Sequence, residues 1–257
     1  MIPLVVVGAA GRMGRAVVET AATVAGFDVK AGVDVGDGPV WWESSRAWNR
    51  DLSAVLAPGD VVVEFSGAEG AAMAAQLCAE RGASLVSGAT GLNPTHEQTV
   101  RQASTRVAVL RAANFSLGLL ALRRALLAVL GAIPAWDVEI VERHHRAKKD
   151  SPSGTALRLA ADVMQFRGLP APSLRHGREG VVGPRPGEEI GMHAVRGGSW
   201  VGDHAVLMAG EGEWIELRHV AQDRSAFARG ALAAAGFVAR AAPGLYALEA
   251  VIDASPT

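Results

Sequence analysis

Cysteine and excess charge of either sign are scarce in this sequence. A single thiol, Cys78, cannot form an internal disulfide or a cysteine-cluster metal site, so we expect a small buried hydrophobe in a reducing compartment. The 25 Lys and Arg side chains nearly balance 26 Asp and Glu, which gives a formal net charge of -1. That balance provides no global field for nucleic acid or an anionic membrane, and neither is an expected partner.

The chain also lacks a long uninterrupted apolar run. Its longest one, residues 117–133, contains Arg123 and Arg124, and the first seven residues carry no basic region of the kind that opens a secretory signal. We therefore expect a cytoplasmic protein.

The first 113 residues alternate β-branched runs with longer alanine-rich segments. Hydrophobic residues make up 49% of the 257 positions and charged ones 20%, which suits a globular chain of two modest domains. We predict strands at 4–7, 28–33, 61–65, 84–86 and 107–110, and helices at 12–25, 68–81 and 94–104. The strand runs are nearly continuously apolar, as in a parallel sheet with helices on both faces.

After Asn114 the pattern changes. A helix at 117–130 and a strand at 136–142 precede strands at 189–195, 204–209 and 213–220, with a mobile loop expected at 178–186. A helix at 225–241 and residues 248–252 are expected to return to the first domain. We predict an α/β protein with a Rossmann-like, doubly wound parallel sheet in a dinucleotide-binding domain of residues 1–115 and 226–257. Residues 116–225 would form a smaller α+β domain with a mixed sheet.

A glycine-rich turn follows the first predicted strand. Gly8, Gly11 and Gly14 form a G-x-x-G-x-x-G pattern that opens a helix, and Asp34 ends the next strand twenty residues after Gly14. Glycines permit close backbone approach, the helix N-terminus attracts a pyrophosphate, and the acid can accept hydrogen bonds from ribose hydroxyls. A structural turn and a solvated aspartate are the alternatives. Val35 offers no charge for a 2′-phosphate, so NADH is favoured slightly over NADPH, which Arg12 keeps open.

Two more loops follow predicted strands, at residues 88–91 and 112–115. Ligands of open α/β sheets bind at the carboxyl ends of strands, so these loops are candidates for the nicotinamide end. Each could equally be a turn in which Asn or Thr satisfies backbone groups.

Residues 142–155 carry the densest chemistry. Two histidines, two lysines and two arginines gather between Glu142 and Lys149, and the following Ser-Pro-Ser-Gly-Thr resembles a helix start. Histidine can transfer a proton near neutral pH, lysine can bind or protonate an anionic or imine-bearing substrate, and a helix N-terminus can hold a carboxylate. A solvated basic face and an ordinary cap are the alternatives, and no third ligand follows that would suit a metal site.

The run E-x-H-H-x-x-K-x-D-x-P-S-G-T, from Glu142 to Thr155, resembles the signature of dihydrodipicolinate reductases, and the resemblance extends over essentially the whole chain. It implies a catalytic pair, His144 and Lys148, and a substrate-binding set, His145, Gly154 and Thr155. It also implies that the cofactor contacts Gly8, Ala9, Ala10, Gly11, Arg12, Met13, Asp34, Gly88, Ala89, Thr90, Ala112, Ala113, Asn114 and Phe115.

By this resemblance the chain would reduce 4-hydroxy-tetrahydrodipicolinate with NADH or NADPH, lose water, and act in lysine biosynthesis through diaminopimelate. Its small-molecule partner would be a cyclic dicarboxylate, and it would form a homotetramer through the sheet of the second domain. The departures are few: Ser66-Gly67-Ala68 replaces Thr-x-Pro, Ala89 replaces a common Thr, and Val35 replaces a frequent basic residue. A reductase of another cyclic imine and a nicotinamide-binding sensor without turnover are the rival hypotheses.

Overall fold

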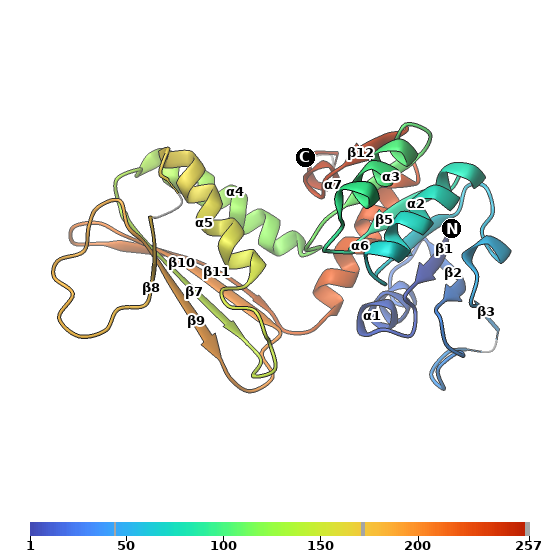
Figure 1. Ribbon diagram of the computed structural model, residues 1–257, viewed down its shortest axis with the longest axis horizontal. Helices are drawn as coiled ribbons and strands as arrows, with labels where there is room; N and C mark the ends of the chain where they lie inside the picture. The colour runs from blue at the N-terminus through green and yellow to red at the C-terminus, as the bar shows by residue number, and fades with distance from the viewer. Residues whose placement is uncertain (44, 171–172, 255–257) are drawn as a thin grey trace. The chain divides into compact units, whose positions relative to one another are not determined.

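The computed structural model describes residues 1–43, 45–170 and 173–254, which form two compact units (Figure 1). The first comprises Met1–Leu117 and the segment from Arg224 onward, and the second comprises Gly118–Asp223. The predicted fold class, a Rossmann-like α/β sheet with a second, mixed sheet, is confirmed. That the first unit binds the dinucleotide and the second binds substrate and forms the tetramer stays a prediction.

The first unit is built on a parallel sheet with the strand order β12-β6-β5-β4-β1-β2-β3. Its central order is that of a dinucleotide-binding fold, in which the chain reverses direction across the sheet beside β1. The elements are β1 (Ile2–Val7), α1 (Arg12–Ala21), β2 (Phe27–Val33), β3 (Ala47–Asn49), the 3-10 helix η1 (Leu52–Ala54), β4 (Val61–Glu64), α2 (Ala68–Arg81), β5 (Ser84–Ser87), α3 (Pro94–Ser104), β6 (Ala108–Arg111), α6 (Ser225–Val238), β12 (Gly244–Tyr246) and α7 (Glu249–Asp253).

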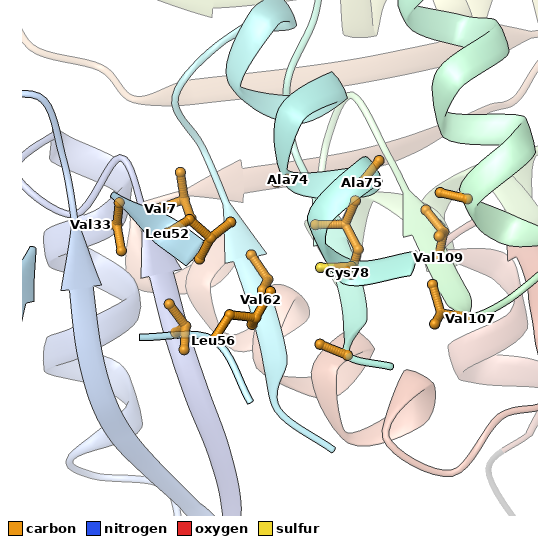
Figure 2. Close-up of a cluster of buried hydrophobic side chains, with 14 of the residues drawn as sticks. Val7, Val33, Leu52, Leu56, Val62, Ala74, Ala75, Cys78, Val107 and Val109 are labelled. Atoms are coloured by element: carbon orange, nitrogen blue, oxygen red, sulfur yellow. The ribbon is translucent and has the colours of Figure 1, made fainter. Parts of the chain in front are cut away.

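Helices cover both faces of this sheet, as the apolar strands predict. Val5 and Val7 share one buried cluster with residues of α2 and α3, and Figure 2 shows Val7 and Cys78 within it. Leu4 and Val6 alternate with them toward the other face and are also fully buried. Burying one such side chain contributes about 1.5–3 kcal/mol, so this core fixes the carboxyl edge from which the loops emerge.

Several element boundaries differ from the sequence prediction. Helix α1 ends at Ala21 and not at residue 25, where the Thr23 N–H and hydroxyl both donate to the Thr20 carbonyl, only three residues back, and tighten the chain into a turn. Helix α6 ends at Val238 rather than at residue 241. The three-residue edge strands β3 and β12 lie outside the apolar runs that predicted the others, and pattern reasoning missed them.

The second unit contains a mixed sheet with the order β11-β10-β7-β9-β8, in which β10 is antiparallel to β7 and β11, and β9 is parallel to β7 and β8. Its elements are α4 (Leu117–Ala132, which starts at the unit boundary), β7 (Asp137–His144), α5 (Gly154–Arg167), β8 (Leu174–His176), β9 (Ile190–Arg196), β10 (Gly202–Ala209) and β11 (Trp214–Ala221). Residues of α4 and α5 share a buried cluster with Val138, Ile140 and Val206. One face of the sheet is therefore packed against these two helices.

Strand β7 alternates buried and half-buried residues along its whole length. On the half-buried face, Glu139 binds Arg178, Arg185 and His193, and Arg178 also pairs with Glu189. The loop expected at 178–186 is thus tied to the sheet through both of its arginines. On the buried face, Glu142 and His144 follow the apolar Val138 and Ile140.

Candidate functional site

The turn after β1 brings the backbone of residues 8–14 into close contact. Gly8 has a φ of 76°, which favours glycine, and a Cβ there would lie 2.9 Å from the Phe65 carbonyl carbon. At Gly14 a Cβ would lie 2.3 Å from the Gly8 carbonyl oxygen. A side chain at either position would disrupt the turn. Glycines here let the backbone approach closely, which a turn that binds a phosphate through its N–H groups requires.

Helix α1 leaves this turn with an open N-terminus. Its N-cap, Gly11, has no capping side chain, and the first turn contains no acidic residue. Asp34 lies beside it: Oδ2 accepts a hydrogen bond from the Ala10 N–H at 2.9 Å, and Oδ1 accepts one from the Val35 N–H at 2.8 Å. The structure therefore brings together the glycine turn and the acid that the sequence spacing singled out, and the next side chain, Val35, is 91% exposed.

The other two predicted cofactor loops leave the same edge of the sheet, residues 88–90 after β5 and residues 112–115 after β6. In the second loop Asn114 Oδ1 accepts a hydrogen bond from the Ser116 N–H at 2.8 Å. This is the contact expected if the loop is a turn in which Asn satisfies a backbone group. Phe115 is buried and packs edge to face on Phe65. The cofactor contacts of both loops stay predictions.

A buried carboxylate, Glu64, lies at this edge and was missed. One oxygen accepts hydrogen bonds from the Ser66 N–H, the Ser66 hydroxyl and the Gly67 N–H, and the other accepts one from the Ser87 hydroxyl at 2.6 Å. The Ser87 hydroxyl also accepts a hydrogen bond from the Ala89 N–H at 3.3 Å. Glu64 thereby holds the loop after β4 and the loop after β5. A charged residue ending an apolar strand was the signal that could have revealed it.

In the second unit, His144 lies at the end of β7 with its side chain 10% exposed. Its Nδ1 lies 2.6 Å from Glu142 Oε2, two residues earlier on the same face of the strand. Burial raises the pKa of Glu142, but hydrogen bonds from Arg196, His144 and the Ser153 N–H outweigh it and hold the pKa below its ordinary value. Glu142 is therefore ionised at neutral pH.

A second imidazole, His204 on β10, packs edge to face on His144 with ring centroids 5.1 Å apart. Its Nε2 lies 3.1 Å from the Ser153 hydroxyl oxygen. Burial, and then the neighbouring His144, lower the pKa of His204 to about 4. His204 is thus a neutral neighbour near pH 7, so a single imidazole, that of His144, remains for proton transfer in this pair.

Helix α5 starts directly beside this pair. Its N-cap is Ser153, whose hydroxyl accepts a hydrogen bond from the Ala156 N–H at 3.2 Å, and Gly154 and Thr155 form the first turn. The first turn contains no acidic residue. Peptide N–H groups at such an end can hold a carboxylate, and Gly154 is exposed.

The loop between β7 and α5 holds the remaining predicted residues. Lys148 Nζ donates to both oxygens of Asp150, at 2.8 and 2.9 Å, and this hydrogen bond lowers the pKa of Asp150. The His145 N–H donates to the Trp200 carbonyl at 2.8 Å, and the Lys148 N–H donates to the His145 carbonyl. The five predicted catalytic and substrate-binding residues therefore all lie in one stretch of the second unit, around the start of α5.

Sequence reasoning did not assign roles to Glu142, Arg196 or His204. Glu142 could have been found, because its position two residues before His144 on a strand places both on one face. Arg196 and His204 come from β9 and β10, far along the chain, and carried no local signal.

Within residues 1–43, 45–170 and 173–254, no three His, Cys, Asp or Glu side chains gather as metal ligands. No helix in the described part of the chain combines the length and apolar character needed to cross a membrane.

Comparisons with known proteins match both units. A family model described as dihydrodipicolinate reductase, N-terminus, matches residues 2–115, and one described as dihydrodipicolinate reductase, C-terminus, matches residues 118–252. A protein of Anaeromyxobacter sp. (strain Fw109-5) named 4-hydroxy-tetrahydrodipicolinate reductase is 42% identical, over 98% of each chain. A protein of the same name from Myxococcus xanthus is 41% identical, again over 98% of each chain.

A solved structure has the same fold. It is the dipicolinate-bound dihydrodipicolinate reductase from Paenisporosarcina sp. TG-14, with a TM-score of 0.79 and 23% sequence identity, covering 96% of this chain and 97% of the other. At 23% identity this likeness shows the fold alone.

Proposed function

Because the chain belongs to the dihydrodipicolinate reductase family, we propose that it reduces 4-hydroxy-tetrahydrodipicolinate to tetrahydrodipicolinate with NAD(P)H and loss of water. The step belongs to lysine biosynthesis through diaminopimelate. The observation that carries the proposal is the pairing of His144 with an ionised Glu142 beside the N-terminus of α5, whose first turn contains no acidic residue. A proton-transfer group and a carboxylate-binding helix end, placed together, suit a cyclic dicarboxylate.

The first unit fits a dinucleotide. The Gly8 and Gly14 positions leave no room for a Cβ, the α1 N-terminus has no internal cap, and Asp34 is fixed by two backbone N–H groups. The α1 turn would hold the pyrophosphate and Asp34 the ribose hydroxyls, while residues 88–90 and 112–115 would line the nicotinamide end. Bound reduced nicotinamide would supply a hydride to a ring carbon of the substrate.

The second unit would bind and protonate the substrate. The N–H groups of Gly154 and Thr155 would hold one carboxylate, and Lys148 would exchange its contact with Asp150 for a second carboxylate or the ring nitrogen. His145 is the remaining predicted contact. His144 would donate the proton to the carbon next to the one that receives hydride, and its imidazolium would stabilise the charge that develops.

NADH is the proposed preferred cofactor. Asp34 places a carboxylate where a 2′-phosphate would need a cation, and the exposed Val35 beside it carries no charge. We expect kcat/KM to be higher with NADH than with NADPH. Asp34→Ala should bring the two kcat/KM values closer together, because it weakens the binding of NADH more than that of NADPH. Preferential use of NADPH by the unmodified chain would contradict this assignment.

A homotetramer in the cytoplasm is proposed from the family relationship. Light scattering on the purified protein is expected to give about four times the chain mass of 26.6 kDa. A monomer would overturn that expectation and leave the activity to be judged separately.

The activity is tested by the loss of NADH or NADPH absorbance with substrate generated in place by the preceding synthase from pyruvate and aspartate semialdehyde. His144→Gln should lower kcat by about 10²–10⁴-fold, the usual contribution of a positioned acid, with KM nearly unchanged. Binding of NADH without oxidation would point to a sensor. Oxidation with another cyclic imine only would point to a different substrate.

A further inference from the structure

Glu142 is a fully buried carboxylate to which three separate parts of the second unit donate hydrogen bonds. Its Oε2 lies 2.6 Å from His144 Nδ1 and accepts a hydrogen bond from Arg196 Nη1 at 2.7 Å. Its Oε1 accepts from Arg196 Nη2 at 2.8 Å and from the Ser153 N–H at 3.0 Å. One side chain on β7 thus joins β9, the proposed proton donor and the N-cap of α5.

The charge state of this carboxylate determines where the His144 ring carries its proton. The bidentate contact from Arg196 keeps Glu142 ionised, so both of its oxygens can only accept hydrogen bonds. The Nδ1 atom must then carry a hydrogen in the neutral ring as well as in the charged one. Proton exchange with substrate is left to Nε2, which lies beside the backbone of Gly202, where a Cβ would approach it to 3.4 Å.

The same carboxylate of Glu142 also holds the start of α5, where we propose that a substrate carboxylate binds. The Ser153 N–H is bound to Glu142, and the Ser153 hydroxyl contacts His204 and caps α5 through the Ala156 N–H. Arg196 donates in addition to the Asp150 carbonyl, at 2.8 Å, in the loop that carries Lys148. Movement of Glu142 would therefore displace both the proton donor and the start of α5.

We propose that Glu142, held by Arg196, is the positioning residue that fixes the Nδ1–H tautomer of His144, leaves Nε2 for proton exchange, and ties this histidine to Ser153, the N-cap of α5. The proposal rests on the proposed function for its kinetic consequences. The tautomer of His144 is a property of the protein without substrate, so that part of the proposal is independent of the proposed function.

The first test is Glu142→Gln. An amide has one accepting oxygen, so if that oxygen serves Arg196 and Ser153, the amide N–H₂ faces His144 Nδ1 and selects the wrong tautomer. In the serine-protease triad the corresponding carboxylate-to-amide change lowers kcat about 10⁴-fold. We expect a loss of kcat on the order of 10²–10³-fold here, with the NADH dissociation constant unchanged.

The pH profile of kcat/KM provides a readout that a loss of packing alone would not move. Glu142 and His204 contact His144 directly. Arg196 on β9 is the register partner of His144 and binds Glu142, and Lys148 lies four residues further along the chain, paired with Asp150. Removing only the negative charge leaves the imidazolium without its counter-ion. The alkaline limb of the Glu142→Gln profile should therefore move to lower pH. Glu142→Asp should recover part of kcat and move the alkaline limb part of the way back to its original pH.

Glu139→Gln is the matched control. Glu139 lies on the same strand and is bound by two arginines and His193, but on the opposite face and away from His144. We expect the kcat of this variant to stay within about twofold of that of the unmodified enzyme, and the limbs of its pH profile to stay at the same pH. Equal losses in the two variants would overturn the proposal in favour of a general effect on the sheet.

Nitrogen NMR of histidine-labelled protein, assigned with His144→Gln, tests the tautomer directly and still decides if Glu142→Gln fails to fold. We expect a protonated Nδ1 and an unprotonated Nε2 in neutral His144. The reverse tautomer, or unchanged kcat in a folded Glu142→Gln variant, would overturn the proposal. Absence of turnover in the unmodified enzyme would instead contradict the proposed function and leave the NMR result valid.

Discussion

The replacement Gly14→Ala tests whether close backbone packing builds the phosphate site. A Cβ at position 14 would lie 2.3 Å from the Gly8 carbonyl oxygen and 2.6 Å from the Ala9 Cα. Both obstacles are backbone atoms, so no side-chain rotation can relieve them. Ordinary contact requires the turn to move by about 1 Å, which costs roughly 1–3 kcal/mol as overpacking does elsewhere.

The same movement would displace the N–H groups that we propose hold the pyrophosphate. Losing one charge-assisted hydrogen bond of about 1.5–3 kcal/mol raises the dissociation constant by roughly 10–100-fold. We therefore expect Gly14→Ala to bind NADH 10–100-fold more weakly, measured by fluorescence titration. The overpacking should also lower the melting temperature by about 3–10 °C.

Gly131→Ala, near the end of α4, is the control. A Cβ there meets nothing within 4 Å, and both replacements gain the same helix propensity, about 1 kcal/mol. The difference between the two variants therefore isolates the clash. If Gly14→Ala binds NADH within threefold of the unmodified chain and melts at the same temperature, close packing of the turn does not build the phosphate site.

Three further predictions concern stability and reactivity. Hydrogen bonds lower the pKa of Glu139 to about 2 against the opposing effect of burial, so it stabilises the fold above pH 4.5 and loses that contribution as the pH falls toward 2. Urea unfolding should show Glu139→Gln less stable by roughly 2 kcal/mol at pH 7, after allowance for solvent screening, and nearly equal to the parent near pH 2; an equal deficit at both pH values would refute this. Ser153→Ala removes a helix cap and leaves the buried His204 without its hydroxyl partner, so calorimetry should give a loss of about 2–3 kcal/mol, and a change below 0.5 kcal/mol would contradict it. Burial, and then Asp60, raise the pKa of Cys78 to about 12, so a thiol reagent should label it only at the rate of unfolding, and rapid labelling of the native protein would show it accessible.

Local features of the sequence determined much of the first unit. The apolar runs that became β1, β2, β4, β5 and β6 are buried on both faces, and α2 and α3 have the predicted bounds. The bounds of these helices depend on interactions within a few residues, such as the cap at Asn93 and the start of α3 at Pro94. The edge strands β3 and β12 lack such signals, because their pairing comes from the neighbouring strand and not from their own residues.

The candidate sites divide in the same way. The sequence by itself determined the glycine turn, Asp34 twenty residues after Gly14, the basic run with His144 and Lys148, and a helix start within residues 151–155. Glycine conformation, helix capping and strand alternation act over short distances along the chain.

Only the tertiary structure decided which groups meet these residues. Arg196 reaches Glu142 across 54 positions, His204 reaches Ser153 across 51, and Ser87 reaches Glu64 across 23. Such pairs form because adjacent strands bring distant residues to one edge or one face, and a buried polar group must then find a hydrogen-bond partner there. Nothing in the local order of residues specifies which partner that is.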